Sequence, residues 1–401
     1  MSKARLASLD QFRGYTVAGM LVVNFWGSYQ CTPQILKHRN DYCSYADLIM
    51  PHFFFAVGVA LQIVVSRHQI SEKSFSWLFY RRLLIRCGFL MLLALAIYFP
   101  YSEIQSYGQF GTSSFWITLF KRDWFQTLTH IAVTTIWILP VLRSSLRLKL
   151  LWGIASAGLH ILLSYWFYFD WVHANPSGID GGPLGFLTWS IPTLTGVAAY
   201  ESIQSAPARF RRSLFGSAIL LMAIGYAVSC ATRCYDRNES ESISLPKLAK
   251  HPVWPEQNDG ATETNRIEPK SEGWDVVLDY LAEPPGTPPP PPNQRAWNYW
   301  MMSQRAGSVS YQTFAAGFSL LVFLLFLYVC DDLGKSLGLF RTLGTNALAC
   351  YVIHGFVSDG IAFFLKKDSP ALWVGIGFGC YAAIVIGVAA FMESRKIFWR
   401  L

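Results

Sequence analysis

Long apolar runs, most of them long enough to form a membrane-spanning helix, dominate the pattern along this chain. They fall roughly at residues 10–28, 48–66, 82–100, 125–142, 149–169, 186–203, 213–231, 312–330, 340–364 and 371–392. A helix needs about 20 consecutive apolar residues to cross the hydrocarbon core of a bilayer. The pattern therefore predicts an all-α polytopic membrane protein with about ten transmembrane helices.

A long polar segment at 232–311 separates the first seven apolar runs from the last three. It contains a proline run from Pro284 to Pro292, which favours a stiff, extended spacer. We expect three regions: a seven-helix bundle at 1–231, this long loop at 232–311, and a three-helix bundle at 312–401. We interpret the loop as an insertion without a catalytic role.

The distribution of basic residues predicts the orientation in the membrane. If the N-terminus is cytoplasmic, the inner segments hold 18 Lys and Arg residues and the short outer loops hold 6. Basic residues accumulate in cytoplasmic loops, whereas long loops have little influence on orientation. We therefore expect both termini in the cytoplasm and the segment 232–311 on the outer side.

Composition supports a membrane environment and excludes some other classes of protein. Hydrophobic residues make up 52% of the chain and charged residues 14%, against about 25% charged in soluble domains. The net charge of +8 is explained by loops that face anionic lipid, so the expected partner is the bilayer and not nucleic acid. The cysteines show no zinc-like pairing, so no metal site is expected. The sequence does not decide whether Cys31 and Cys43 form a disulfide bond.

Three polar residues in the first apolar run are candidates for function. Ionisable groups at the centre of a membrane helix cost about 2.5–3.5 kcal/mol, so they are rarely incidental. Asp10 and Arg13 are three residues apart and can pair on one helix face. Asn24 lies eleven residues after Arg13 and returns to nearly the same face. The spacing predicts a polar stripe, with an Asp10–Arg13 pair that only locks helix packing as the alternative.

Further candidates lie in the first outer loop and in the ninth apolar run. His38 precedes Asp47 by nine residues, just before the second run. Asn346 and His354 share the run 340–364 and suggest a second polar face. Acyl transfer needs a base or nucleophile with a pKa near neutrality, which histidine provides.

Several motifs at the start of the chain resemble one family of membrane enzymes. Residues 5–14 (RLASLDQFRG), Val23-Asn24, Lys37-His38, residues 46–51 (ADLIMP) and residues 53–58 (FFFAVG) occur in the order typical of the heparan-α-glucosaminide N-acetyltransferase family. Segments 185–196 and 343–351 resemble it more weakly. The start is also distantly similar to the acyltransferase type 3 family, which has a histidine where this chain has Asn24.

The resemblance implies a specific activity and specific roles. By analogy, His38 is the catalytic residue and Asn24 belongs to the active site. The donor is cytoplasmic acetyl-CoA, and the acceptor is an amino sugar or polysaccharide, with a glucosamine-like amine, on the lumenal or extracytoplasmic side. His38 then either takes the acetyl group or deprotonates the acceptor. Asn24 stabilises the oxyanion and Asp47 fixes the tautomer of His38.

Two groups of observations limit this prediction. The family's W-N-G after its histidine is replaced here by residues 39–42 (RNDY), so the acceptor pocket is expected to differ. Asp10, Arg13, Asn346 and His354 are expected only to support the site or to bind the donor.

The main alternative is a transporter or flippase of a sugar-like or lipid-linked substrate, without acyl transfer. A structural or assembly protein would leave the polar stripe unexplained. We expect the bacterial cytoplasmic membrane, with a lysosomal membrane and a homodimer left open.

Overall fold

The computed structural model describes residues 6–71, 77–100, 104, 106–205, 207–236, 248–255, 280–290 and 294–399. Within these residues the chain is helical, apart from two isolated β-bridges, and it forms no longer strand. The helices are α1 (Ala7–Trp26), α2 (Tyr45–Ser71), α3 (Trp77–Tyr98), α4 (Ser113–Thr118), α5 (Thr127–Ile138), α6 (Leu146–Leu163), α7 (Phe169–His173), α8 (Phe186–Ser205), α9 (Pro207–Ser229), α11 (Val309–Phe326), α12 (Gly338–Thr345), α13 (Ala347–Ala362) and α14 (Ala371–Ser394).

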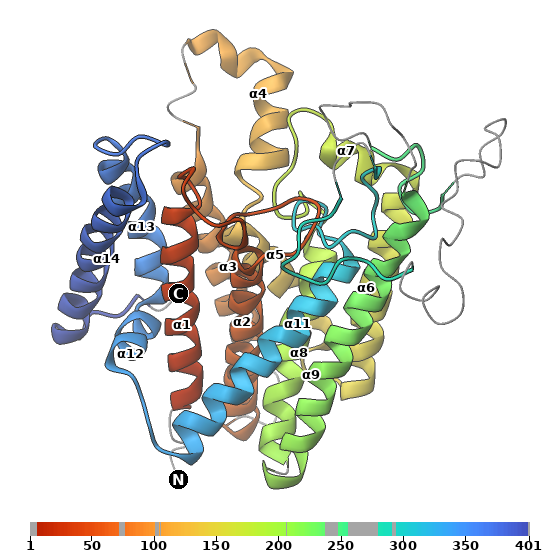
Figure 1. Cartoon of the computed structure of the whole chain (residues 1–401). Helices are drawn as coiled ribbons and strands as arrows, with labels where there is room; N and C mark the ends of the chain where they lie inside the picture. Colours follow the sequence, from red (N-terminus) through yellow and green to blue (C-terminus); the bar gives the residue numbers. More distant parts are fainter. Residues whose placement is uncertain are drawn as a thin grey trace.

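The long helices pack side by side into one bundle (Figure 1). Every apolar run predicted from the sequence overlaps a helix, so the all-α prediction is confirmed. Among the described residues, five spans are long and apolar enough to cross a membrane: Tyr45–Arg67, Leu146–His173, Arg211–Tyr235, Val309–Asp332 and Ala371–Ser394. The number of ten spans and the cytoplasmic position of the termini stay predictions.

The short helix α4 was not expected from the hydrophobic pattern. It projects beyond the ends of the long helices, at the top of Figure 1. Its N-cap residue, Thr112, accepts a hydrogen bond from the backbone of Phe115 at 3.4 Å. The ring of Trp116 stacks on that of Phe120 at 6.0 Å, and both side chains are nearly half exposed. A cap and local ring contacts, with no long apolar run, are sufficient to form this helix.

A pair of glycines lets α2 and α8 approach closely. A Cβ on Gly58 would collide with the carbonyl oxygen of Thr193, and one on Gly196 with the carbonyl oxygen of Phe55. Small residues at such positions are the usual means of close helix packing in membranes. Toward the N-terminal ends of both helices, the ring of Phe54 stacks on Trp189 at 4.4 Å. The N-terminal part of α2, which carries Asp47, is therefore fixed against α8.

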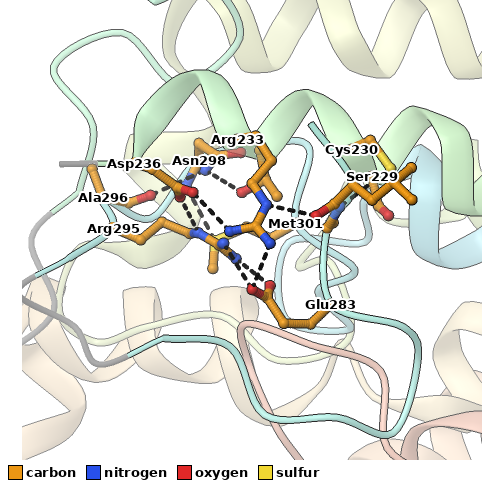
Figure 2. Close-up of polar contacts among 12 residues, drawn as sticks. Ser229, Cys230, Arg233, Asp236, Glu283, Arg295, Ala296, Asn298 and Met301 are labelled. Carbon is orange, nitrogen blue, oxygen red and sulfur yellow. Dashed lines mark hydrogen bonds and ion pairs between the residues drawn. The ribbon is translucent and has the colours of Figure 1, made fainter. Parts of the chain in front are cut away.

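Described residues from three parts of the segment 232–311 are joined by a cluster of ion pairs at the end of α9 (Figure 2). Arg295 is only 4% exposed and pairs with Asp236 at 2.6 Å and Glu283 at 2.9 Å. Arg233 pairs with the same two carboxylates at 3.0 and 3.1 Å. A buried guanidinium needs such partners, because removing it from water is costly.

The described part of the proline-rich segment, residues 280–290, does not stand apart from the bundle. The backbone N–H of Gly286 donates to the carbonyl oxygen of Cys43 at 2.7 Å. Gly286 adopts a positive φ of 89°, which glycine tolerates without strain. Residues 280–290 thus contact the segment between α1 and α2 directly. Cys31 is exposed and Cys43 is buried, and both are free thiols, so the disulfide considered between them is not formed.

Candidate active site

A cavity of about 430 Å³ opens where the segment between α1 and α2 meets α1, α2, α3, α5 and α13. Its volume lies in the range of small-ligand sites. Loops 174–185 and 294–308 close another part of its wall. Its polar lining consists of Asn24, His38, Arg39, Asn40, Asp47, Tyr98, Gln126, Thr127, Asp180, Gln304, Arg305, Tyr351 and His354.

His38 and Asp47 form the central pair of this cavity. His38 Nδ1 donates a hydrogen bond to Asp47 Oδ1 at 2.9 Å. Half of the His38 side chain remains exposed, whereas the Asp47 side chain is 1% exposed. Because an ionised carboxylate only accepts hydrogen bonds, Nδ1 carries the proton and neutral His38 has its lone pair on Nε2. The pair thus has the geometry of an oriented general base or nucleophile.

Asp47 is held in place by the start of α2. The backbone N–H of Ser44 donates to Asp47 Oδ2 at 2.9 Å, and the Ser44 hydroxyl lies 2.8 Å from the same oxygen. In return, the Asp47 N–H points to the Ser44 hydroxyl at 3.4 Å. This reciprocal arrangement is a capping box with aspartate at the third position of the helix. The negative charge is also favoured there by the helix dipole.

The environment of His38 shifts its protonation equilibrium. Burial lowers its pKa, but the hydrogen bond and charge of Asp47, with the charge of Asp180 and the side chain of Gln304, outweigh that effect. The pKa of His38 is therefore raised above its ordinary value. A histidine near neutrality can both take up and release a proton during a reaction.

Asn24 reaches the cavity from the C-terminal end of α1 and is oriented by His354. His354 Nδ1 lies 2.5 Å from the carbonyl oxygen of Tyr351, so this nitrogen carries the proton. His354 Nε2 then accepts a hydrogen bond from Asn24 Nδ2 at 3.1 Å. The carboxamide therefore keeps a second N–H that this bond does not use. Tyr351 is itself held by a hydrogen bond between its hydroxyl and that of Tyr98.

A second carboxyl group, on Asp180, lies in the same cavity and is 6% exposed. It follows α7 in a tight loop where Asp180, Gly181 and Gly182 all have positive φ angles of 56°, 87° and 59°. Aspartate and glycine are the residues that tolerate this conformation. The loop is fixed by Tyr168, whose hydroxyl donates to the Gly181 carbonyl at 2.6 Å. Asp180 is thus a rigidly placed group.

Not every predicted site residue reaches the cavity. Asn346 is fully buried elsewhere, where its Nδ2 donates to the carbonyl of Ile397 at 3.2 Å and its Oδ1 accepts from the N–H of Trp399 at 3.3 Å. It holds the C-terminal tail. Asp10 and Arg13 lie in the first turns of α1 and do not line the cavity. The polar stripe of α1 meets the cavity only at Asn24, about 16 Å beyond Arg13.

A model of the catalytic domain of heparan-α-glucosaminide N-acetyltransferase matches residues 5–225. The chain belongs to this family. Membership of the heparan-α-glucosaminide N-acetyltransferase family makes it an acetyltransferase by descent, and the apolar helices make it a multi-pass membrane protein. We find no matching relative among functionally curated proteins. The matched range contains Asn24, His38, Asp47 and Asp180, whereas Gln304, Arg305 and His354 lie beyond it.

Several cavity residues were missed in the sequence: Tyr98, Asp180, Gln304, Arg305 and Tyr351. Asp180 had a signal, because an aspartate before two glycines marks a turn with positive φ angles. Gln304 and Arg305 had none, and the interpretation of the segment 232–311, in which they lie, as an insertion without a catalytic role directed attention away from them. Arg39 and Asn40, at which the sequence differs from the family pattern, line the cavity.

Proposed function

We propose that this protein transfers an acetyl group from cytoplasmic acetyl-CoA to an amino sugar or glycan on the outer side of the membrane. The observation that carries the proposal is the meeting of the His38–Asp47 pair and the His354-oriented Asn24 on one cavity, in a member of an acetyltransferase family. Each of these two pairs has a role in acyl transfer.

The first role in acyl transfer belongs to His38, whose Nε2 carries a lone pair. With Nδ1–H bound to Asp47, Nε2 is free either to remove a proton from the acceptor or to attack the thioester carbonyl itself. Asp47 also stabilises the positive imidazolium that arises in both routes. A covalent acetyl-histidine, if formed, would be trapped by rapid acid quench and detected by mass spectrometry of the His38 peptide.

The second role in acyl transfer belongs to the side-chain amide of Asn24. When the thioester carbonyl is attacked, its oxygen becomes negatively charged, and an oriented N–H donor stabilises that charge. Asn24 Nδ2 has one hydrogen directed at His354 and one remaining for the oxyanion. Removing one such donor typically reduces turnover by about 10²–10³.

The wall of the cavity suggests how substrates are placed. Arg39 and Arg305 bring two positive charges to it, next to the carboxylates of Asp47 and Asp180. A second cavity of about 370 Å³ shares Asn24, His38 and Arg39 with the first. His38 and Asn24 therefore stand where two spaces adjoin, as a transfer between a donor and an acceptor requires. We assign the acceptor to the outer side, and the protein to the bacterial cytoplasmic membrane.

The test is transfer of labelled acetyl from acetyl-CoA to a panel of amino sugars and glycans by the purified protein. We expect transfer by the wild type, loss of transfer in His38→Ala, and full transfer in His251→Ala. His251 is a suitable control because it lies in the outer loop against Tyr165 and does not line the cavity. Transfer that survives in His38→Ala would refute the role of His38. Absence of both transfer and acetyl-CoA binding in the wild type would favour a transporter or flippase.

A further inference from the structure

The two carboxylates of the cavity differ in how far their hydrogen-bonding capacity is used. Asp47 accepts from His38 Nδ1 and from the backbone of Ser44, and it has no exposed surface. Asp180 accepts from one side chain: Gln304 Nε2 donates to its Oδ1 at 2.7 Å. Among the described residues, no side chain donates to Asp180 Oδ2. Asp47 is therefore occupied, whereas Asp180 has an oxygen left for a ligand.

Gln304 brings a second acceptor to the same place. While its Nε2 is bound to Asp180, its carbonyl oxygen Oε1 is buried and has no hydrogen-bond partner among the described residues. A buried acceptor without a donor destabilises the folded protein, and a bound donor would remove that cost. The lone pair on His38 Nε2 is a third acceptor on this cavity.

Three acceptors, one of them charged, match the donors of a primary ammonium group. An ammonium has three N–H donors and no acceptor, whereas a hydroxyl has a single donor. We propose that Asp180 and Gln304 bind the ammonium group of the acceptor, and that Asp180 removes its first proton, so that the enzyme selects primary amines over hydroxyls. This inference rests on the proposed acetyl transfer to an amino sugar and assigns a further catalytic residue.

The proton removed by Asp180 makes the amine a nucleophile. The ammonium gives one proton to Asp180 Oδ2 and keeps the electron pair on nitrogen. In the direct route that pair forms the C–N bond to the acetyl carbon while the C–S bond breaks. The second nitrogen proton passes to His38 Nε2 and then to the thiolate of CoA. In the acetyl-histidine route the same neutral amine displaces Nε2, which keeps its electron pair and accepts the second proton.

The electrostatics of Asp180 suit this task. Burial raises its pKa to about 6, and the charge of Asp47 adds to the effect, while the Gln304 hydrogen bond and the charge of His38 oppose it. A base whose pKa lies close to the working pH is ionised before binding and still accepts a proton readily. A carboxylate with the ordinary pKa of about 4 would be a weaker base.

The test compares two nucleophiles that differ in protonation. Glucosamine reaches the enzyme largely as an ammonium, whereas methoxyamine is uncharged at neutral pH and needs no initial deprotonation. In Asp180→Asn we expect a loss of kcat/KM of about 10²-fold or more with glucosamine. Methoxyamine should keep most of its rate, and acetyl-CoA binding and the melting temperature at pH 7 show that the variant is folded. In Gln304→Met we expect mainly a higher KM for glucosamine.

Each alternative outcome has a distinct meaning. Equal losses with both nucleophiles in Asp180→Asn would show a structural role and overturn the inference, as would no loss with either. Acetyl transfer by the wild type to hydroxyl acceptors as readily as to amines would also overturn it. If the folded wild type transfers acetyl to no amine of the panel and does not bind acetyl-CoA, the acetyl transfer itself is refuted, and the inference falls with it.

Discussion

Replacing Asp47 with asparagine tests how tightly the tautomer of His38 is controlled. In the wild type, Asp47 Oδ2 accepts from the backbone N–H of Ser44 at 2.9 Å, and Oδ1 accepts from His38 Nδ1 at 2.9 Å. The Ser44 N–H is a fixed donor, so the single oxygen of an asparagine must stay on that side. Its NH₂ group then faces His38 Nδ1, which becomes an acceptor, and the proton moves to Nε2.

The expected effect is large because the proton occupies the reactive nitrogen. A base or nucleophile with the wrong tautomer loses about 10²–10⁴ in turnover, equivalent to about 3–5.5 kcal/mol in the activation free energy. The substitution Asp47→Ala removes the carboxylate without imposing a tautomer. We therefore expect Asp47→Ala to be the more active of the two variants, although both fall well below the wild type.

The assay is the initial rate of acetyl transfer in detergent, measured across pH for both variants and the wild type. In the proposed mechanism His38 acts as the neutral imidazole, and Asp47 raises its pKa in the wild type. The acidic limb of the rate profile should therefore shift to lower pH in Asp47→Ala. An Asp47→Asn variant that is folded and as active as the wild type, or more active than Asp47→Ala, would refute the reasoning.

Two further predictions concern stability and the long loop. The pKa of Asp180 is raised to about 6, so this group favours the folded state less as pH rises from about 4 through 6. Compared with the wild type, Asp180→Asn should therefore gain up to about 3 kcal/mol more free energy of unfolding at pH 8 than at pH 4, at about 1.36 kcal/mol per pKa unit. A difference in unfolding midpoint between variant and wild type that is the same at both pH values would contradict this. Arg295→Met removes the buried partner of Asp236 and Glu283 and leaves them Arg233, so it costs at most about 3–5 kcal/mol, the cost of an unpaired buried charge. We expect a higher KM for the acceptor with unchanged acetyl-CoA binding, and a variant with wild-type KM would contradict the anchoring role of Arg295.

The helices were predictable because long apolar runs have one stable form in a bilayer. With no water to bond the backbone, the chain must form helices there, whatever the details of its packing. What lies between the runs was less predictable. The short helix α4 has no apolar run of its own, and its start depends on a single cap at Thr112. Lys149, counted among the inner basic residues, is buried and pairs with Glu201 of α8.

The site was predictable where its residues are close in sequence. Asn24, His38 and Asp47 lie within one short stretch and carry family motifs, and Ser44 and Asp47 have capping-box spacing. The contacts of Asn24 with His354, and of Asp180 with Gln304, join residues separated by 330 and 124 positions. No local pattern specifies such contacts. The long loop was interpreted as having no catalytic role, yet it supplies Gln304 and Arg305 to the cavity wall.

The bond between Asn24 and His354 also has a consequence for biosynthesis. The ribosome delivers His38 and Asp47 to the membrane early, with α1 and α2, but His354 follows only near the end of translation. A chain interrupted before α13 would insert its first helices and still lack the group that orients Asn24. The proposed catalytic centre is therefore complete only after nearly the whole chain has been made, and any premature stop codon before His354 yields a protein that lacks this contact.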